Sequence, residues 1–258
     1  MSKGVAITGM GIISAIGNNV SENYEALIEG RKGISKISKI DTIHKDAIMV
    51  GEIDFTNKDF EDQLGLSADN NYSRTAMLGI VAAKQAIENA GITNIKKYST
   101  GLISSTSVGG MDMTEQYYYD YLENETHRKY IDSHHAGDST QRIAEHLGIE
   151  ESLVTTISTA CSSAANAIML GARLIKSGEL DRVVVGGKDC LSKFTINGFK
   201  TLMILSDTYN TPFDENRKGL NLGEAAAYLV LESDKVVKAE NKKYFGKTPQ
   251  EVFDRFNA

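Results

Sequence analysis

The chain has 258 residues, a formal net charge of −6 at pH 7, 41% hydrophobic residues and 24% charged residues. This composition is ordinary for a globular protein with a sizeable core, and the acidic balance argues against nucleic acid or an anionic membrane as a partner. The two cysteines, Cys161 and Cys190, lack the spacing of a metal site, and a disulfide scaffold is unusual in a chain this long. No apolar stretch approaches the roughly 20 residues that span a bilayer. We therefore expect a soluble cytoplasmic protein without a metal.

Strand-like and helix-like segments alternate along the chain, which predicts an α/β fold. Apolar runs bounded by glycine and turn residues predict strands at 5–8, within 100–110, and at 153–157, 182–186 and 225–232. Apolar residues at helical spacing predict helices at 20–29 (with Ser21 as a cap), 73–90, 139–147 and 162–177. Residues 31–70 show no clear pattern. Residues 111–135, rich in tyrosine, histidine and charge, are predicted to leave the sheet.

The polar tail differs in character from the rest of the chain. It begins at Ser233, and the segment TPQE at 248–251 has the pattern of a helix capping box with Pro249 at the first helical position. We expect a domain over residues 1–240 and a short polar tail, helical or disordered, over 241–258.

Two other patterns are incomplete. The segment TGMGIIS resembles part of a dinucleotide-binding fingerprint, but Ser14 stands where its third glycine belongs. The adjacent His134 and His135 suggest a metal, yet no further ligands follow at a recognisable spacing. We therefore expect neither a nucleotide cofactor nor a metal site.

The segment ISTACSSAANAI places Cys161 where a predicted strand turns directly into a helix. Unpaired N–H groups and the positive end of the helix dipole stabilise a thiolate at such a position, and the same groups can hold an oxyanion. The following serines and alanines leave space for a substrate. A buried structural cysteine is the alternative at Cys161, and position alone leaves it open. Cys190 lacks this setting, so we interpret it as structural.

Several blocks in this order resemble the N-terminal half of the β-ketoacyl-acyl-carrier-protein synthases, the ketosynthases of the thiolase fold. They run from residue 3 to about 240: VAITGMGIIS, ISSTSVGG, STACSSAANAI, LDRVVVGGKD, NGFKTLMILS and TPFDENRKGLNLGEAAAYLVLE. The resemblance implies one five-stranded mixed sheet covered by helices, half of a duplicated fold. Arg217, Gly223 and Glu224 match structural positions of the last block.

The resemblance also implies a chemistry. Cys161 matches the residue that accepts an acyl group from a carrier-protein thioester, with its own N–H forming half of the oxyanion hole. Val108 and Phe199 match positions that line the acyl pocket, and His134 lies where the family faces a partner's pocket across a dimer. The implied partners are acyl carrier protein thioesters and a second ketosynthase-like chain, and no cofactor is implied.

The sequence departs from the family in three places. The first is small: Ala225 stands where glycine often follows in the last block. HHAGDST at 134–140 is more polar than usual, which suggests an unusual acyl chain. The blocks NGFKTLMILS and PFDENRKGLNLGE also resemble those of ketosynthases of aryl-polyene or flexirubin type. The family's two catalytic histidines belong to blocks of the second half that do not occur here.

These departures leave three readings open: an acyltransferase component completed by a missing half, a non-catalytic partner that pairs through residues 153–157, and an inactive fragment. Retention of Cys161 favours the first reading, because a pure partner needs no thiol. Absence of both histidines favours the second.

Overall fold

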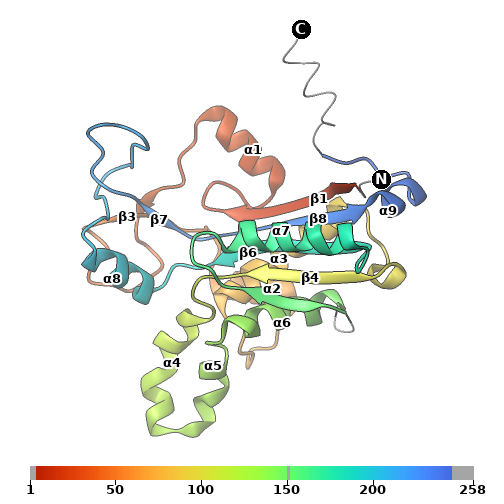
Figure 1. Cartoon of the computed structure of the whole chain (residues 1–258). Coiled ribbons are helices and arrows are strands. Elements are labelled where there is room, and N and C mark those ends of the chain that lie inside the picture. The colour runs from red at the N-terminus through yellow and green to blue at the C-terminus, as the bar shows by residue number, and fades with distance from the viewer. Residues whose placement is uncertain (1–3, 150–151, 246–258) are drawn as a thin grey trace.

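A mixed five-stranded sheet organises the chain in the computed structural model, which describes residues 4–149 and 152–245 (Figure 1). The strand order is β1-β8-β6-β4-β5. The strands are β1 (Val5–Ser14), β8 (Ala225–Ser233), β6 (Arg182–Asp189), β4 (Thr100–Ser105) and β5 (Val154–Ile157). β8 runs antiparallel to both β1 and β6, whereas β6, β4 and β5 are parallel to one another. The predicted α/β class and five-stranded mixed sheet are confirmed.

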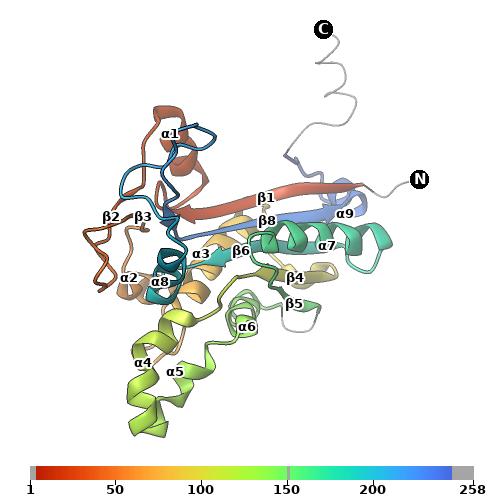
Figure 2. The same ribbon diagram turned by 60° about the vertical axis from the view of Figure 1, so that its left-hand side comes forward.

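Helices cover both faces of this sheet (Figure 2). α3 (Arg74–Asn89) and α6 (Ala136–Leu147) pack on one face, and α7 (Ser163–Ser177) packs on the other. Along β6, Val184 joins the core under α3, while Val183 and Val185 join the core under α7. The run VVV at 183–185 is continuously apolar because both faces of the strand are covered.

A smaller sheet lies beside the main one. It consists of β2 (Ser35–Lys36), β3 (Met49–Gly51) and β7 (Leu222–Gly223), with α2 (Asn57–Leu64) and α8 (Lys193–Thr201) nearby. Residues 31–70, which showed no clear pattern, thus hold two short strands and a helix. Strands of two or three residues are too short for alternation to be visible in a sequence.

Residues 111–132 form an arm that projects away from the sheet, as expected for this segment (Figures 1 and 2). It contains α4 (Met111–Glu123), a 3₁₀ turn η2 (Glu125–His127) and α5 (Arg128–Asp132). The rings of Tyr117 and Tyr130 stack across the arm with centroids 4.1 Å apart. This stacking joins the two helices where few core contacts are present.

Some boundaries differ from those predicted. β1 continues to Ser14, because Gly9 and Gly11 let it lie against α3: a Cβ there would come within 2.2 Å and 2.1 Å of the carbonyl oxygens of Ala86 and Ala82. α1 (Val20–Glu29) is capped by Asn19, whose side chain accepts the Glu22 N–H, so the prediction of Ser21 as the cap is wrong.

The remaining elements are the 3₁₀ turn η1 (Ile95–Lys97) and α9 (Asp234–Ala239). The predicted capping box at 248–251 lies outside the described residues. Within the described ranges, no helix combines the length and apolar character needed to cross a membrane.

Candidate active site at the corner between β5 and α7

Cys161 lies on a tight corner that joins β5 to α7. β5 ends at Ile157 and α7 begins at Ser163, so the thiol precedes the helix by two residues and is exposed. Ala160 has a φ of 51°, in the left-handed region that residues other than glycine rarely adopt. Such a conformation costs on the order of 1–3 kcal/mol, and it clusters at functional sites.

Hydrogen bonds from the first turn of α7 hold this corner in place. The Ser163 hydroxyl donates to the Ala160 carbonyl at 2.6 Å and accepts the Thr159 N–H at 2.8 Å. The Ser162 hydroxyl donates to the Thr159 carbonyl at 2.8 Å, and Asn166 donates to the Thr159 hydroxyl at 2.9 Å. The serines after the cysteine therefore maintain the strained backbone and place the thiol at the N-terminus of α7.

The thiol opens into a shallow pocket of about 330 Å³. Mostly small residues line it, from β4, β6, β7 and β8, from the corner and from α7: Ser105, Ser107, Ala160, Cys161, Ser163, Ala164, Gly187, Lys188, Asp189, Gly223, Ala225 and Ala227. At Gly187 a Cβ would lie 2.6 Å from the Ser105 hydroxyl oxygen and 3.0 Å from the Ala164 Cβ. Glycine at this position therefore lets α7 approach the sheet.

No histidine is among the described residues that line this pocket. The described part of the chain also holds no cluster of three or more histidine, cysteine or carboxylate side chains suited to a metal ion. Asp189 is the carboxylate in the lining, and its oxygens accept the Thr106 hydroxyl at 2.6 Å and the Ser107 N–H at 2.9 Å. It therefore serves to hold the end of β4.

The structure brings two of the three residues expected to line an acyl pocket into neighbouring segments. Val108 is half-buried in the turn after β4, and a Cβ on the next residue, Gly109, would lie 2.5 Å from the His134 carbonyl oxygen. The His134 ring is exposed and lies 3.0 Å from the Thr114 hydroxyl, measured at Nδ1. Phe199 is half-buried on α8. Their role in acyl binding stays a prediction.

Cys190 has the opposite environment. It is buried at the end of β6, and its sulfur accepts the Thr75 hydroxyl at 3.1 Å. Burial raises the pKa of this thiol well above its usual range, with the Asp112 carboxylate adding to the effect. A thiol in this state is a poor nucleophile, in agreement with its structural interpretation from the sequence.

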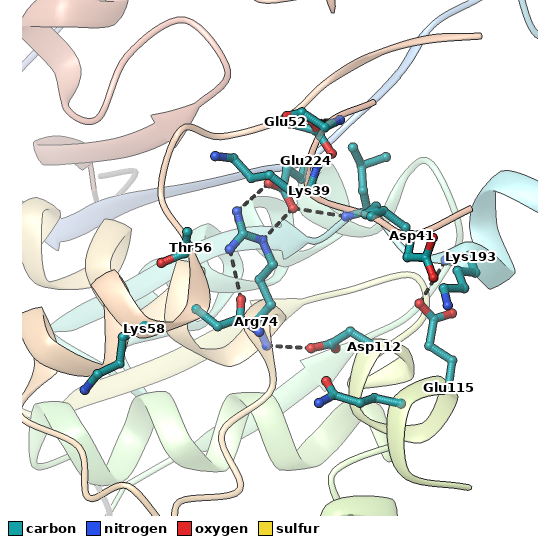
Figure 3. A pocket seen from close by; sticks show the side chains of 15 residues that line it. Lys39, Asp41, Glu52, Thr56, Lys58, Arg74, Asp112, Glu115, Lys193 and Glu224 are labelled. Carbon is teal, nitrogen blue, oxygen red and sulfur yellow. Dashed lines mark hydrogen bonds and ion pairs between the residues drawn. The ribbon is translucent and has the colours of Figure 1, made fainter. Parts of the chain in front are cut away.

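A second, larger pocket of about 820 Å³ lies between α2, α4 and α8 (Figure 3). Its floor is the buried ion pair between Arg74 and Glu224, 2.6 Å apart. Glu224 also accepts the N–H groups of Ile53 at 3.0 Å and Leu191 at 3.2 Å. Glu224 was recognised from the sequence as a structural position, and it ties β8 to the segments on either side.

Asp112 sits at the wall of the same pocket and accepts the Arg74 N–H at 2.8 Å (Figure 3). Burial raises the pKa of its carboxyl to about 6. Asp112 thus joins the base of the projecting arm to the first turn of α3.

The sequence interpretation missed Lys188. This side chain is only 2% exposed and lies among hydroxyl groups under the strand ends of the Cys161 pocket. Burial lowers its pKa to about 7, against the opposing effect of Asp189. A lysine directly after the apolar run VVVGG was the available signal, since a strand buried on both faces rarely carries a charge.

Comparison with known families gives a match over nearly the whole chain. Residues 2–236 match the family described as "Beta-ketoacyl synthase, N-terminal domain". Among curated proteins, the chain is 29% identical over 243 residues to a 3-oxoacyl-[acyl-carrier-protein] synthase 2 of Staphylococcus aureus strain N315, covering 90% of this chain and 58% of that protein. A protein of the same name from Vibrio harveyi is 29% identical over 255 residues, covering 93% and 60%.

Solved structures agree with this match. The ishigamide ketosynthase/chain length factor gives a TM-score of 0.86 at 26% identity, covering 95% of this chain and 62% of that one. The ketosynthase ApeO in complex with its chain length factor ApeC from Xenorhabdus doucetiae gives 0.75 at 31% identity, covering 89% and 58%. The chain therefore spans about three fifths of the length of these relatives.

Proposed function

Because the chain belongs to the β-ketoacyl synthase N-terminal domain family, a ketosynthase family with the thiolase-like fold, we propose that Cys161 accepts an acyl group from a carrier-protein thioester. The observation that carries this proposal is the exposed thiol on a strained corner before α7, facing a pocket of small residues. Of the two thiols, Cys190 is buried and protonated. Nucleophilic catalysis needs a thiol that substrate can reach and a rigid backbone that holds it in place.

The proposed step uses groups of this chain. The Cys161 sulfur attacks the thioester carbonyl carbon and forms a tetrahedral oxyanion, which the N–H of Cys161 and the positive end of α7 stabilise. The carbon–sulfur bond to the carrier then breaks, and the carrier's thiolate takes up the proton that Cys161 lost. The products are acyl-Cys161 and the free thiol of the carrier.

Chain elongation requires more than the pocket of Cys161 provides. Decarboxylation of a malonyl thioester places negative charge on an enolate oxygen, and the described lining of the pocket supplies no histidine to stabilise it. General acid–base groups of this kind contribute about 10²–10⁴-fold. We therefore expect acylation by this chain, with elongation dependent on groups that it does not carry.

The test is product analysis after incubation of the purified 258-residue protein with an acyl-carrier protein and a malonyl-carrier protein. We expect slow formation of acyl-Cys161 and no elongated β-ketoacyl product. A Cys161→Ser variant should lose the acylation. Robust elongation by this chain alone would contradict the proposal, since one of its own histidines would then have to stabilise the enolate.

A non-catalytic role as the partner of another ketosynthase-like chain is the second candidate. Two similar structures contain a chain length factor, and β5 forms an edge of the sheet here. Mixing the protein with a ketosynthase that lacks its partner distinguishes the two roles. If Cys161→Ser supports product formation as well as the wild type does, the partner role is correct and the acylation of Cys161 is dispensable.

The acylation assay can also determine which acyl chain Cys161 prefers. His134 is exposed beside the turn that carries Val108, which supports a pocket wall more polar than an alkyl chain prefers. We expect acyl thioesters with conjugated or aromatic chains to acylate Cys161 faster than saturated chains of equal length.

A further inference from the structure

A buried amine holds five elements together beneath the Cys161 pocket. Lys188 Nζ donates to the Ser104 hydroxyl at 2.6 Å and to the Thr140 hydroxyl at 3.3 Å. Ser104 also hydrogen-bonds the Tyr228 hydroxyl, and the Thr156 hydroxyl donates to Thr140 at 2.7 Å. The cluster thereby joins β4, β5, β6, β8 and α6 through side chains alone.

The strands joined by this cluster are those that carry the pocket. Ser104 pairs with Thr156 on β5 and with Gly186 on β6, so the three strand ends lie at one level of the sheet. β4 continues into Ser107, β5 into Cys161, and β6 into Asp189, and all three line the pocket. A change in the cluster therefore moves the residues around the thiol.

Lys188 has no carboxylate within hydrogen-bond distance among its described contacts. The charged group that acts on it is Asp189, whose oxygens are already bound to the Thr106 hydroxyl at 2.6 Å and the Ser107 N–H at 2.9 Å. An ammonium group buried among hydroxyls without a counter-ion is disfavoured by several kcal/mol, at order of magnitude. The neutral amine avoids this cost.

Among the described residues, the other elements around Lys188 supply no counter-ion. β8 contributes the phenol of Tyr228, whose pKa is raised by burial. α3 faces the lysine with Gly79, where a Cβ would lie 3.3 Å from the Lys188 Cγ. On α6, the charged side chains Asp138 and Arg142 pair with each other at 3.5 Å.

We propose that Lys188, as a neutral amine, is a positioning residue for Cys161. In this state the two N–H groups of the amine donate to the Ser104 and Thr140 hydroxyls. Protonation replaces the amine lone pair with a third N–H and adds a positive charge that no described hydrogen-bond partner of Lys188 neutralises. The new ammonium then attracts Asp189 away from Thr106 and Ser107, which loosens one wall of the pocket.

The test is the alkylation rate of Cys161 by iodoacetamide between about pH 5.5 and 9, followed by peptide mass spectrometry. The wild-type rate is divided by that of Lys188→Met, which removes the part of the thiol titration that the two proteins share. We expect this ratio to fall by about threefold or more as pH drops through 7, because the charged lysine disturbs the pocket only in the wild type. Lys176→Met, at an exposed lysine of α7, should give a flat ratio.

If the ratio of the wild-type rate to the Lys188→Met rate also does not vary with pH, the proposal is overturned. If that variant fails to fold, the 13Cε chemical shift of Lys188 in the wild-type protein decides: titration near pH 7 supports the neutral amine, and titration above pH 9 contradicts it. The inference rests on the proposed function for the importance of Cys161, but the alkylation rate measures the reactivity of this thiol without any acyl substrate. A protein that shows this alkylation profile and takes up no acyl group would overturn the proposed function alone.

Discussion

At the scale of single residues, the ion pair between Arg74 and Glu224 is a buried contact on which the stability of the fold depends. The two groups are 2.6 Å apart, and Glu224 accepts two backbone N–H groups besides. Removing one partner of such a pair leaves an uncompensated buried charge. The pair therefore fixes β8 against the smaller sheet.

We predict that Glu224→Gln lowers the free energy of unfolding by about 3–5 kcal/mol, since the Arg74 guanidinium loses its counter-ion in a buried site. Urea denaturation followed by circular dichroism measures this change. Asp62→Asn, which breaks the exposed pair with Lys58, is the matched control and should leave the midpoint nearly unchanged. Equal effects of the two variants would contradict the assignment.

Lys188 gives a prediction for stability as well. Its pKa is about 7 in the folded state, against 10.5 for an ordinary exposed lysine. Between these values the unfolded chain holds a proton that the folded chain lacks, so unfolding takes up a proton and stability rises with pH. We expect the wild type to gain stability relative to Lys188→Met by about 0.7 kcal/mol per pH unit at pH 7, where the folded lysine is half protonated, rising toward about 1.4 kcal/mol per pH unit above pH 8.

Urea titrations at about pH 7.0, 7.5, 8.0 and 8.5 measure this difference. The buried Cys190 thiol and Tyr228 phenol have raised pKa values in the folded state, but both variants carry them, so their contribution cancels in the difference. A difference that does not vary with pH would show that Lys188 keeps its proton on folding.

At the scale of elements, the approach of α7 to the sheet controls the site. Gly187 on β6 faces Ala164 and Ser105, and a side chain there has no room. We predict that Gly187→Ala destabilises the protein by about 1–3 kcal/mol and slows acylation, because α7 and the corner before it must move outward. Thermal unfolding and the acylation assay measure the two effects.

Gly137 on α6 is the matched control, because a Cβ added there meets nothing within 4 Å. Gly137→Ala should keep or slightly raise stability, as expected for alanine in a helix. If Gly187→Ala behaves like this control, close packing of α7 is not what positions the thiol.

Local pattern predicted the elements that build this site. The helical spacing in α3, the strand before Cys161 and the apolar run of β6 all gave the correct element type, because the apolar pattern of each follows from how it is buried: α3 against one face of the sheet, and β6 between helices on both faces. The extension of β1 was missed, since Gly9 and Gly11 do not look like strand residues until α3 packs on them. The cluster around Lys188 joins five elements, so its partners depend on tertiary structure that no local pattern contains.

At the scale of the whole molecule, the free edge of β5 suggests assembly. The carbonyl groups of Leu153 and Ile157 accept N–H groups of Leu102 and Thr106, so the N–H groups of Val154 and Thr156 point away from β4. A free strand edge is a template for pairing with another chain.

We predict that the protein forms dimers or larger species through this edge at micromolar concentration. Val154→Pro, which removes an N–H that points outward, should shift the population toward monomer because the ladder cannot extend. Light scattering measures the mass. A stable monomer of the wild type would contradict a role for the β5 edge in assembly.

The central claim is that Cys161, and not Cys190, carries the acyl group. The most direct measurement is peptide mapping after incubation with an acyl-carrier protein, on the wild type, Cys161→Ser and Cys190→Ser. We predict that the acyl mass appears on the peptide containing Cys161 in the wild type and in Cys190→Ser, and is lost in Cys161→Ser. Acylation that persists in Cys161→Ser, or that maps to the peptide containing Cys190, would contradict the account.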